Sequence, residues 1–181
     1  MRLPVALEKK LAAIFPTARQ REQFVIDVIS KALENPPEPS REMQPTSIGG
    51  SLHLFTDGGS RGNPGQAAVG CVLLEPDGTV LKEFCETIGI QTNNIAEYKA
   101  LIAGLKMAQE FQPNHLICHL DSELVVKQVN GEYRVKMVTF QPLIDEINRL
   151  KNQFKSVQVV YVPRAQNSRA DALVNKALDG R

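Results

Sequence analysis

Four acidic residues stand at positions where the sequence pattern predicts strand ends or helix starts. Asp57 and Asp121 each follow a segment typical of a strand, while Glu97 and Asp171 lie near the starts of two expected helices. If the two strands are parallel neighbours, the carboxylates of Asp57 and Asp121 lie roughly 5 Å apart. Helix N-termini favour acids, so Glu97 and Asp171 can lean over the same strand ends.

These four acids, called the acidic cluster below, predict bound cations. Converging carboxylates without a matching set of Lys or Arg are too unfavourable unless positive charge is bound between them. Hard oxygen ligands select Mg²⁺ or Mn²⁺, which accept phosphate oxygens as further ligands. The site then resembles a two-metal phosphodiesterase centre with ions about 4 Å apart. One ion would generate and orient the attacking hydroxide, and the other would steady the leaving oxygen.

Each acid taken alone also has a simpler interpretation. An Asp before Gly-Gly, such as Asp57, is usually a turn former. Asp121 can be only a helix cap, Asp171 only an acid favoured by the helix dipole, and Glu97 only a solvated helix residue. The prediction therefore depends on the four together, because the expected strand order brings these positions to one place.

The elements expected to position the acids alternate in type along the chain. Strands are predicted at 52–56, 67–74, 80–88, 115–120 and 157–162, and helices from 92 to before 113, at 122–129, at 142–154 and after 167. This order predicts an α/β fold with a mixed five-stranded sheet, three antiparallel strands followed by parallel ones, flanked by helices. The first strand is expected to end at Asp57-Gly58-Gly59.

The region before this domain has a different pattern. Residues 1–34 carry two apolar stripes at helical spacing, which predict a helical hairpin that loosely resembles a ribbon-helix-helix module. Residues 35–50 contain four prolines and predict a linker to a catalytic domain at 51–181. Because so short a hairpin cannot form its own core, we expect it to dock or to form a homodimer.

Composition excludes several classes of protein. The 181 residues are 43% hydrophobic, and 21 Lys and Arg balance 20 Asp and Glu, so no basic excess indicates nucleic acid. The three cysteines are widely spaced among apolar neighbours, which favours a reducing, cytoplasmic compartment. No segment approaches the length of apolar chain needed to cross a bilayer, so no membrane partner is expected.

Four runs of residues resemble the sequence blocks of type 1 ribonuclease H, in the family order. They are Phe55–Gly65, Thr92–Tyr98, Asp121–Ser122 and Val162–Asp171. The resemblance implies the ribonuclease H fold and an endonuclease that cuts the RNA strand of an RNA/DNA hybrid, leaving 5′-phosphate and 3′-hydroxyl ends. It also implies that the acidic cluster holds the metal ions.

The resemblance further implies contacts to the substrate. The minor groove of the hybrid would lie along the Gly58–Gly62 loop, including Gly59 and Ser60, and along Asn63. Asn93 and Asn94 would reach the 2′-hydroxyl groups that distinguish RNA from DNA. A simpler interpretation of these two amides is helix capping.

The chain departs from many family members in three ways. No His lies between Val162 and Asp171, and Arg164 is the nearest charged candidate to bind the scissile phosphate, unless it is only a solvated loop charge. The segment 122–162 is too short to hold the basic protrusion of some members, and in this the chain resembles the archaeal-like short branch. Only a modest basic patch of Lys127, Arg134 and Lys136 remains. Glu123 stands where many members have Gln.

Two other functions remain open from the sequence. One is a non-catalytic nucleic-acid-binding module of the same fold, although such a module would gain nothing from carboxylates facing phosphates. The other is a broader nuclease that also cuts double-stranded RNA, because both duplexes share A-form geometry and minor-groove hydroxyls.

Overall fold

The computed structural model describes Thr17, Arg19 and residues 50–180. The chain divides into two units, Met1–Gln44 and Pro45–Arg181, and the described residues lie almost wholly in the second. Apart from Thr17, Arg19 and Gly50, the predicted hairpin at 1–34 and the predicted linker at 35–50 lie outside the described residues and stay predictions.

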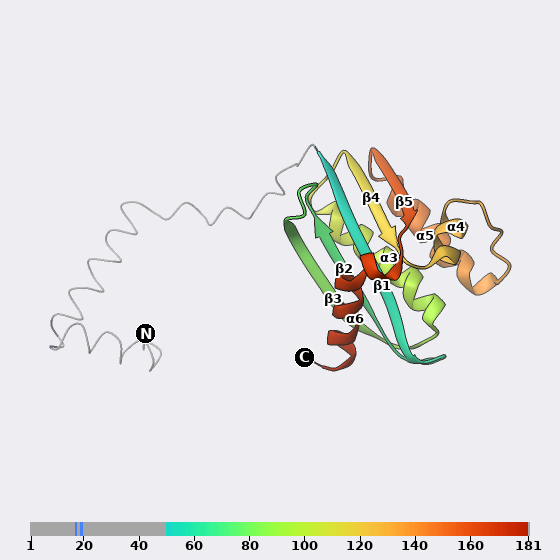
Figure 1. The fold of residues 1–181 in the computed structure, drawn as a ribbon, viewed down its shortest axis with the longest axis horizontal. Coiled ribbons are helices and arrows are strands. Elements are labelled where there is room, and N and C mark those ends of the chain that lie inside the picture. Colours follow the sequence, from blue (N-terminus) through green and yellow to red (C-terminus); the bar gives the residue numbers. More distant parts are fainter. Residues whose placement is uncertain (1–16, 18, 20–49, 181) are drawn as a thin grey trace. The chain divides into compact units, whose positions relative to one another are not determined.

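A five-stranded mixed sheet forms the centre of this domain, in the order β3-β2-β1-β4-β5 (Figure 1). The strands are β1 (Ser51–Gly62), β2 (Gly65–Leu74), β3 (Val80–Gln91), β4 (His115–Leu120) and β5 (Ser156–Tyr161). The first three are antiparallel, whereas β4 pairs in parallel with β1 and with β5. The predicted mixed sheet and the predicted pairing of the strands before Asp57 and Asp121 are therefore confirmed.

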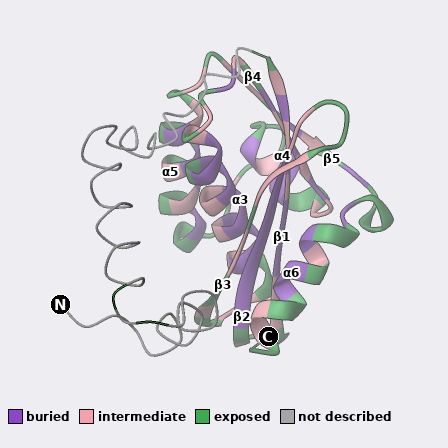
Figure 2. Ribbon diagram, turned by 90° about the vertical axis from the view of Figure 1, so that its left-hand side faces the viewer, coloured by how far each residue is buried: buried purple, intermediate pink, exposed green. Residues whose placement is uncertain are grey.

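Helices cover both faces of the sheet. They are α3 (Asn93–Gln109), α4 (Glu123–Val129), α5 (Gln141–Lys151) and α6 (Ser168–Leu178), with short 3-10 helices η1 (Val138–Phe140) and η2 (Arg164–Gln166). Figure 2 shows α3 and α5 on one side of the sheet and α6 on the other. Since β2 lies between α3 and α6, its residues Ala67–Leu73 are buried without alternation. No described helix is both long and apolar enough to cross a membrane.

Strand β1 is longer than predicted. The sequence indicated that it ends at Asp57 and that a loop follows at Gly58–Gly62, and both expectations are wrong. Parallel pairing with β4 does stop at Phe55, but antiparallel pairing with β2 continues to Gly62. Asp57 therefore lies within a strand, at the point where one of its two neighbours has ended.

Close packing explains the glycine that follows Asp57. A Cβ atom at Gly58 would lie 2.1 Å from the backbone carbon of Ala96 in α3 and 2.3 Å from the backbone nitrogen of Glu97. No side chain fits there, so the start of α3 can rest directly on the backbone of β1. The glycine serves helix packing and not a turn, and it brings Glu97 beside Asp57.

Candidate active site

Three members of the acidic cluster meet at the point where β4 ends beside β1. One carboxylate oxygen from each of Asp57, Glu97 and Asp121 lies within 4.8 Å of the others. Asp57 projects from β1, Asp121 follows β4 directly, and Glu97 lies in the second turn of α3. The start of α3 is fixed by Thr92, whose hydroxyl accepts a hydrogen bond from the Ile95 N–H at 3.3 Å.

Asp171 lies beside this group but outside the closest set. It is in the first turn of α6, and its carboxylate pairs with Arg164 and accepts a hydrogen bond from Asn175 Nδ2 at 3.0 Å. Its negative charge nevertheless contributes to raising the pKa of Asp57. Arg164 is thus an ion-pair partner of Asp171, although its side chain is largely exposed.

Burial and mutual repulsion disfavour the ionised forms of these acids. Burial, followed by the charges of Asp121 and Asp171, raises the pKa of Asp57 to about 7. Burial, followed by the charges of Asp57 and Asp121, raises the pKa of Glu97 to about 9. Nearby Arg164 opposes both shifts but does not cancel them. Positive charge bound among the acids would relieve this repulsion.

The donor set fits a hard divalent cation. Glu97 Oε2 is buried and has no hydrogen-bond partner among the described residues. A buried carboxylate oxygen without a partner is unfavourable, and it is available as a ligand. Carboxylate oxygens from three chain segments match the preference of Mg²⁺ and Mn²⁺ for oxygen ligands.

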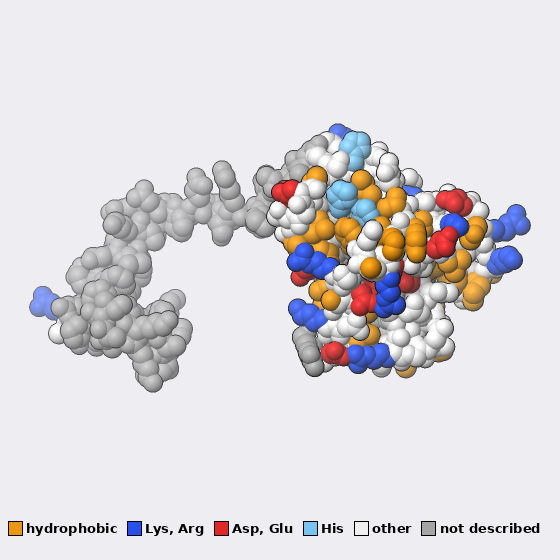
Figure 3. All heavy atoms as spheres, in the orientation of Figure 1, with side chains coloured by type: hydrophobic (Ala, Val, Ile, Leu, Met, Phe, Trp, Pro, Cys, Tyr) orange, Lys and Arg blue, Asp and Glu red, His pale blue; other side chains and the backbone are white. Residues whose placement is uncertain are grey.

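A cavity of about 290 Å³ opens over the acidic cluster. All four acids line it, together with Gly58, Gly59, Ser60, Arg61, Asn93, Arg164, Val174, Asn175 and Leu178. In Figure 3, acidic and basic side chains lie next to one another over the region where η2 and α6 run in Figure 1. The cavity is therefore polar and carries both signs of charge.

The residues predicted to contact substrate are brought together only in part. The Ser60 N–H donates to Asn93 Oδ1 at 3.3 Å, and the Asn93 N–H donates to Asn63 Oδ1 at 3.2 Å. These bonds join β1, the β1–β2 turn and the start of α3 into one wall. Asn63 and Asn94 are exposed and do not line the cavity, whereas Ser60 and Asn93 do.

The modest basic patch is partly neutralised. Lys127 pairs with Glu123 at 2.6 Å and lies within 3.2 Å of the Tyr133 hydroxyl. Glu123 is therefore occupied by an ion pair on the surface of α4.

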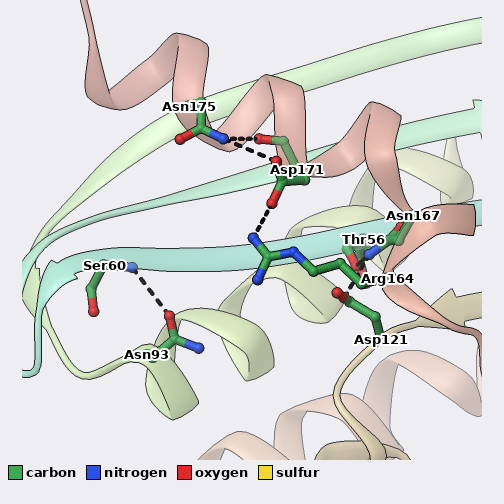
Figure 4. Close-up of polar contacts among 8 residues, drawn as sticks. All are labelled: Thr56, Ser60, Asn93, Asp121, Arg164, Asn167, Asp171 and Asn175. Carbon is green, nitrogen blue, oxygen red and sulfur yellow. Dashed lines mark hydrogen bonds and ion pairs between the residues drawn. The ribbon is translucent and has the colours of Figure 1, made fainter.

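Two amides at the site were not recognised from the sequence. Asn167 is buried and donates to Asp121, while Asn175 donates to Asp171 (Figure 4). The sequence predicted for Asn167 only that it precedes the last helix. For Asn175 a signal was available, because it lies four residues after Asp171 and the two side chains therefore lie on neighbouring turns of α6.

The fold and the acidic site together define the ribonuclease H-like class of α/β proteins, and comparisons with known proteins agree. A family model described as reverse transcriptase-like matches residues 55–177. Ribonuclease HI of Halobacterium salinarum is 45% identical over 131 residues, which cover 72% of this chain and 66% of that protein. A bifunctional protein of Mycobacterium tuberculosis is 44% identical over 127 residues, 70% of this chain and 35% of that protein.

Solved structures give the same result. The crystal structure of RNase H1 from Halobacterium salinarum matches with a TM-score of 0.71 and 44% identity, covering 73% of this chain and 100% of that one. LC11-RNase H1, solved in complex with an RNA/DNA hybrid, matches with a TM-score of 0.68 and 39% identity, covering 71% and 97%. The chain belongs to the ribonuclease H family.

Proposed function

We propose that this protein is an endonuclease that hydrolyses the RNA strand of RNA/DNA hybrids. The observation that carries the proposal is the convergence of the Asp57, Glu97 and Asp121 carboxylates within 4.8 Å, with Asp171 beside them in the same cavity. A protein that only bound nucleic acid would gain nothing from four acids facing phosphates. A relative that matches over 97% of its own length binds an RNA/DNA hybrid in its crystal structure, which supports the choice of substrate.

The acids would bind two Mg²⁺ or Mn²⁺ ions in this proposal. Asp57, Glu97 and Asp121 offer the closest group of oxygens, and Asp171, which lines the same cavity, offers another. When bound, the ions would supply Lewis-acid activation of water and of the phosphoryl group. Cleavage would leave 5′-phosphate and 3′-hydroxyl ends.

Arg164 would bind the scissile phosphate. Its guanidinium lies at the cavity next to Asp171, and its two planar N–H edges suit phosphate oxygens. The ion pair with Asp171 holds the side chain at the cavity, which supports this role because a phosphate bound there would meet its positive charge. This position explains how a chain without a His in this loop can still offer a cation.

The wall formed by Ser60, Asn63 and Asn93 would read the RNA strand. An amide can donate to and accept from a 2′-hydroxyl, which DNA lacks. Gly58 and Gly59 line the same cavity and would lie along the minor groove of the hybrid. Asn94 is exposed one residue along α3 and would contact the next nucleotide.

A cleavage assay with three labelled duplexes tests the proposal. RNA/DNA, RNA/RNA and DNA/DNA duplexes are incubated with the full chain in Mg²⁺, in Mn²⁺ and in EDTA. We expect metal-dependent cutting of the RNA strand in the hybrid alone. Asp57→Asn and Asp121→Asn should each lower the rate at least about 100-fold, because an amide is a poor ligand for these ions.

The other outcomes separate the alternatives. Binding of hybrid without cutting in either metal would indicate a binding module, and equal cutting of RNA/RNA would indicate a broader nuclease. Asp145→Asn, at an exposed acid of α5 that accepts a hydrogen bond from Gln141 and does not line the cavity, is the matched control and should keep full activity.

A further inference from the structure

Asn167 makes contacts that its place in the fold does not require. It precedes α6 as the N-cap residue, yet its side chain forms no capping hydrogen bond. Asn at this position ordinarily accepts a bond from a backbone N–H of the first turn. Here the side chain, which is only 1% exposed, points away from its own helix and toward the acidic cluster (Figure 4). The capping contribution to stability is forgone.

The amide of Asn167 instead joins two strands. Its Nδ2 donates to the backbone oxygen of Thr56 at 2.9 Å and to Asp121 Oδ1 at 2.8 Å. Both partners are acceptors, so only the NH₂ group can face them and the orientation of the amide is fixed. Its own Oδ1 is left buried without a hydrogen-bond partner among the described residues. The side chain therefore keeps its contact with Asp121 although its amide oxygen has no hydrogen bond among the described residues.

Asp121 needs such a partner. Asp121 follows the last residue of β4, so its backbone is not held by pairing within the sheet. It also lies close to Asp57, whose negative charge repels its own. Thr56, the other partner of Asn167, directly precedes Asp57 in β1. The backbone oxygen of Asn167 also accepts from the Asp171 N–H at 3.1 Å. One residue therefore contacts the segments that carry three of the four acids.

We propose that Asn167 is a positioning residue that holds the Asp121 carboxylate toward Asp57 and thereby sets the affinity of the site for divalent metal. The inference rests on the metal-binding acids of the proposed function. Without the amide, Asp121 would turn away from Asp57 and toward solvent, because repulsion would no longer be opposed. Residues that orient metal ligands in this way typically change metal affinity by about 10 to 100-fold.

The test is titration calorimetry of Mn²⁺ binding to the full chain at pH 8. Asn167→Ala should weaken binding by about 10-fold or more. The serine of Asn167→Ser fills more of the space of the asparagine than alanine does, but it does not reach Asp121. This variant should lose a similar amount of Mn²⁺ affinity, and it replaces Asn167→Ala in the test if the alanine variant does not fold. Asn130→Ala is the matched control, since Asn130 Nδ2 also bonds a strand carbonyl, that of Val159 at 3.0 Å, but Asn130 does not line the cavity over the acids.

Cleavage kinetics give a second readout. For hybrid substrate, kcat of Asn167→Ala should fall while KM stays unchanged, and raising the Mn²⁺ concentration should restore part of the rate. A lower melting temperature with unchanged Mn²⁺ affinity would mean a purely structural role and overturn the inference. If the wild-type protein binds Mn²⁺ but cuts no hybrid, the proposed function is refuted. The Mn²⁺ affinities of wild type and Asn167→Ala would still decide the role of Asn167.

Discussion

Asp57 and Asp121 each lie two residues beyond Phe55 and His119, the last pair of the parallel ladder between β1 and β4. Strand alternation therefore turns the two acids to the same face of the sheet. Because the ladder fixes this register, the strands cannot slide to separate the charges. Protonation, substitution or a bound cation are the remaining ways to relieve the repulsion, and each leads to a measurable effect.

Without divalent metal, stability should fall as the pH rises from about 5 to 9. The folded pKa of Asp57 is raised to about 7 and that of Glu97 to about 9, so the folded chain holds protons that the unfolded chain has already released. Protonation of Asp57 and Glu97 stabilises the folded chain fully at a pH below the pKa values that they have in the unfolded chain. This stabilisation is lost as the pH rises through the higher pKa values that they have in the folded chain. Thermal unfolding followed by circular dichroism in EDTA measures this trend.

Asp57→Asn should flatten the same pH profile, because it removes one of the repelling charges. At pH 8 and without metal, the variant should be more stable than wild type by about 1–3 kcal/mol. The exposed Asp145→Asn should leave the profile unchanged. A metal-free wild type that becomes more stable between pH 5 and 9 would contradict the electrostatic account.

Addition of Mg²⁺ or Mn²⁺ should raise the unfolding temperature at pH 8. Metal present at about 100 times its dissociation constant stabilises the folded state by about 2.7 kcal/mol. The gain should be smaller at pH 6, where protons on Asp57 and Glu97 compete with the ion. Calorimetric melts with and without metal make the comparison. An equal gain in Asp57→Asn would show that the ions bind elsewhere.

Gly58→Ala should strongly destabilise the protein. The new Cβ would lie 2.1 Å from the backbone carbon of Ala96, so α3 must move away from β1 at a cost of about 3 kcal/mol or more. Gly131→Ala is the comparison, since that glycine has φ of 77° but nothing within 4 Å of the added atom. It should cost about 1 kcal/mol, measured by urea unfolding. Similar losses for both variants would refute the packing explanation.

The sequence was sufficient to predict the mixed sheet and the meeting of Asp57, Glu97 and Asp121. The change from alternating to helical periodicity predicted the order of strands and helices along the chain, and the parallel pairing of β1 with β4 meets the condition under which Asp57 lies beside Asp121. It failed at Gly58, because a glycine after Asp is equally compatible with a turn and with a helix resting on a strand. Only the contact between α3 and β1 distinguishes these two cases.

The role of Asn167 was beyond sequence reasoning for a related reason. Asn before a helix is fully explained by capping, and nothing local shows that its side chain turns to a strand more than 40 residues away. Arg164 was left open between phosphate binding and a solvated charge, and its ion pair with Asp171 shows that it lies beside the acidic cluster. For Asn167 the deciding information is a contact between distant segments.

Arg164→Ala should weaken substrate binding more than chemistry. Loss of the cation at the cavity removes one phosphate contact, so KM for hybrid should rise about 10-fold and the dependence of log KM on log salt should fall by about one unit. Arg169→Ala is the matched control, because Arg169 is also an exposed arginine in an ion pair, with Glu83 at 3.0 Å, but does not line the cavity. Steady-state cleavage at several salt concentrations measures both variants. If they change KM equally, Arg164 contributes only general surface charge, and the phosphate must be bound by the metal site alone.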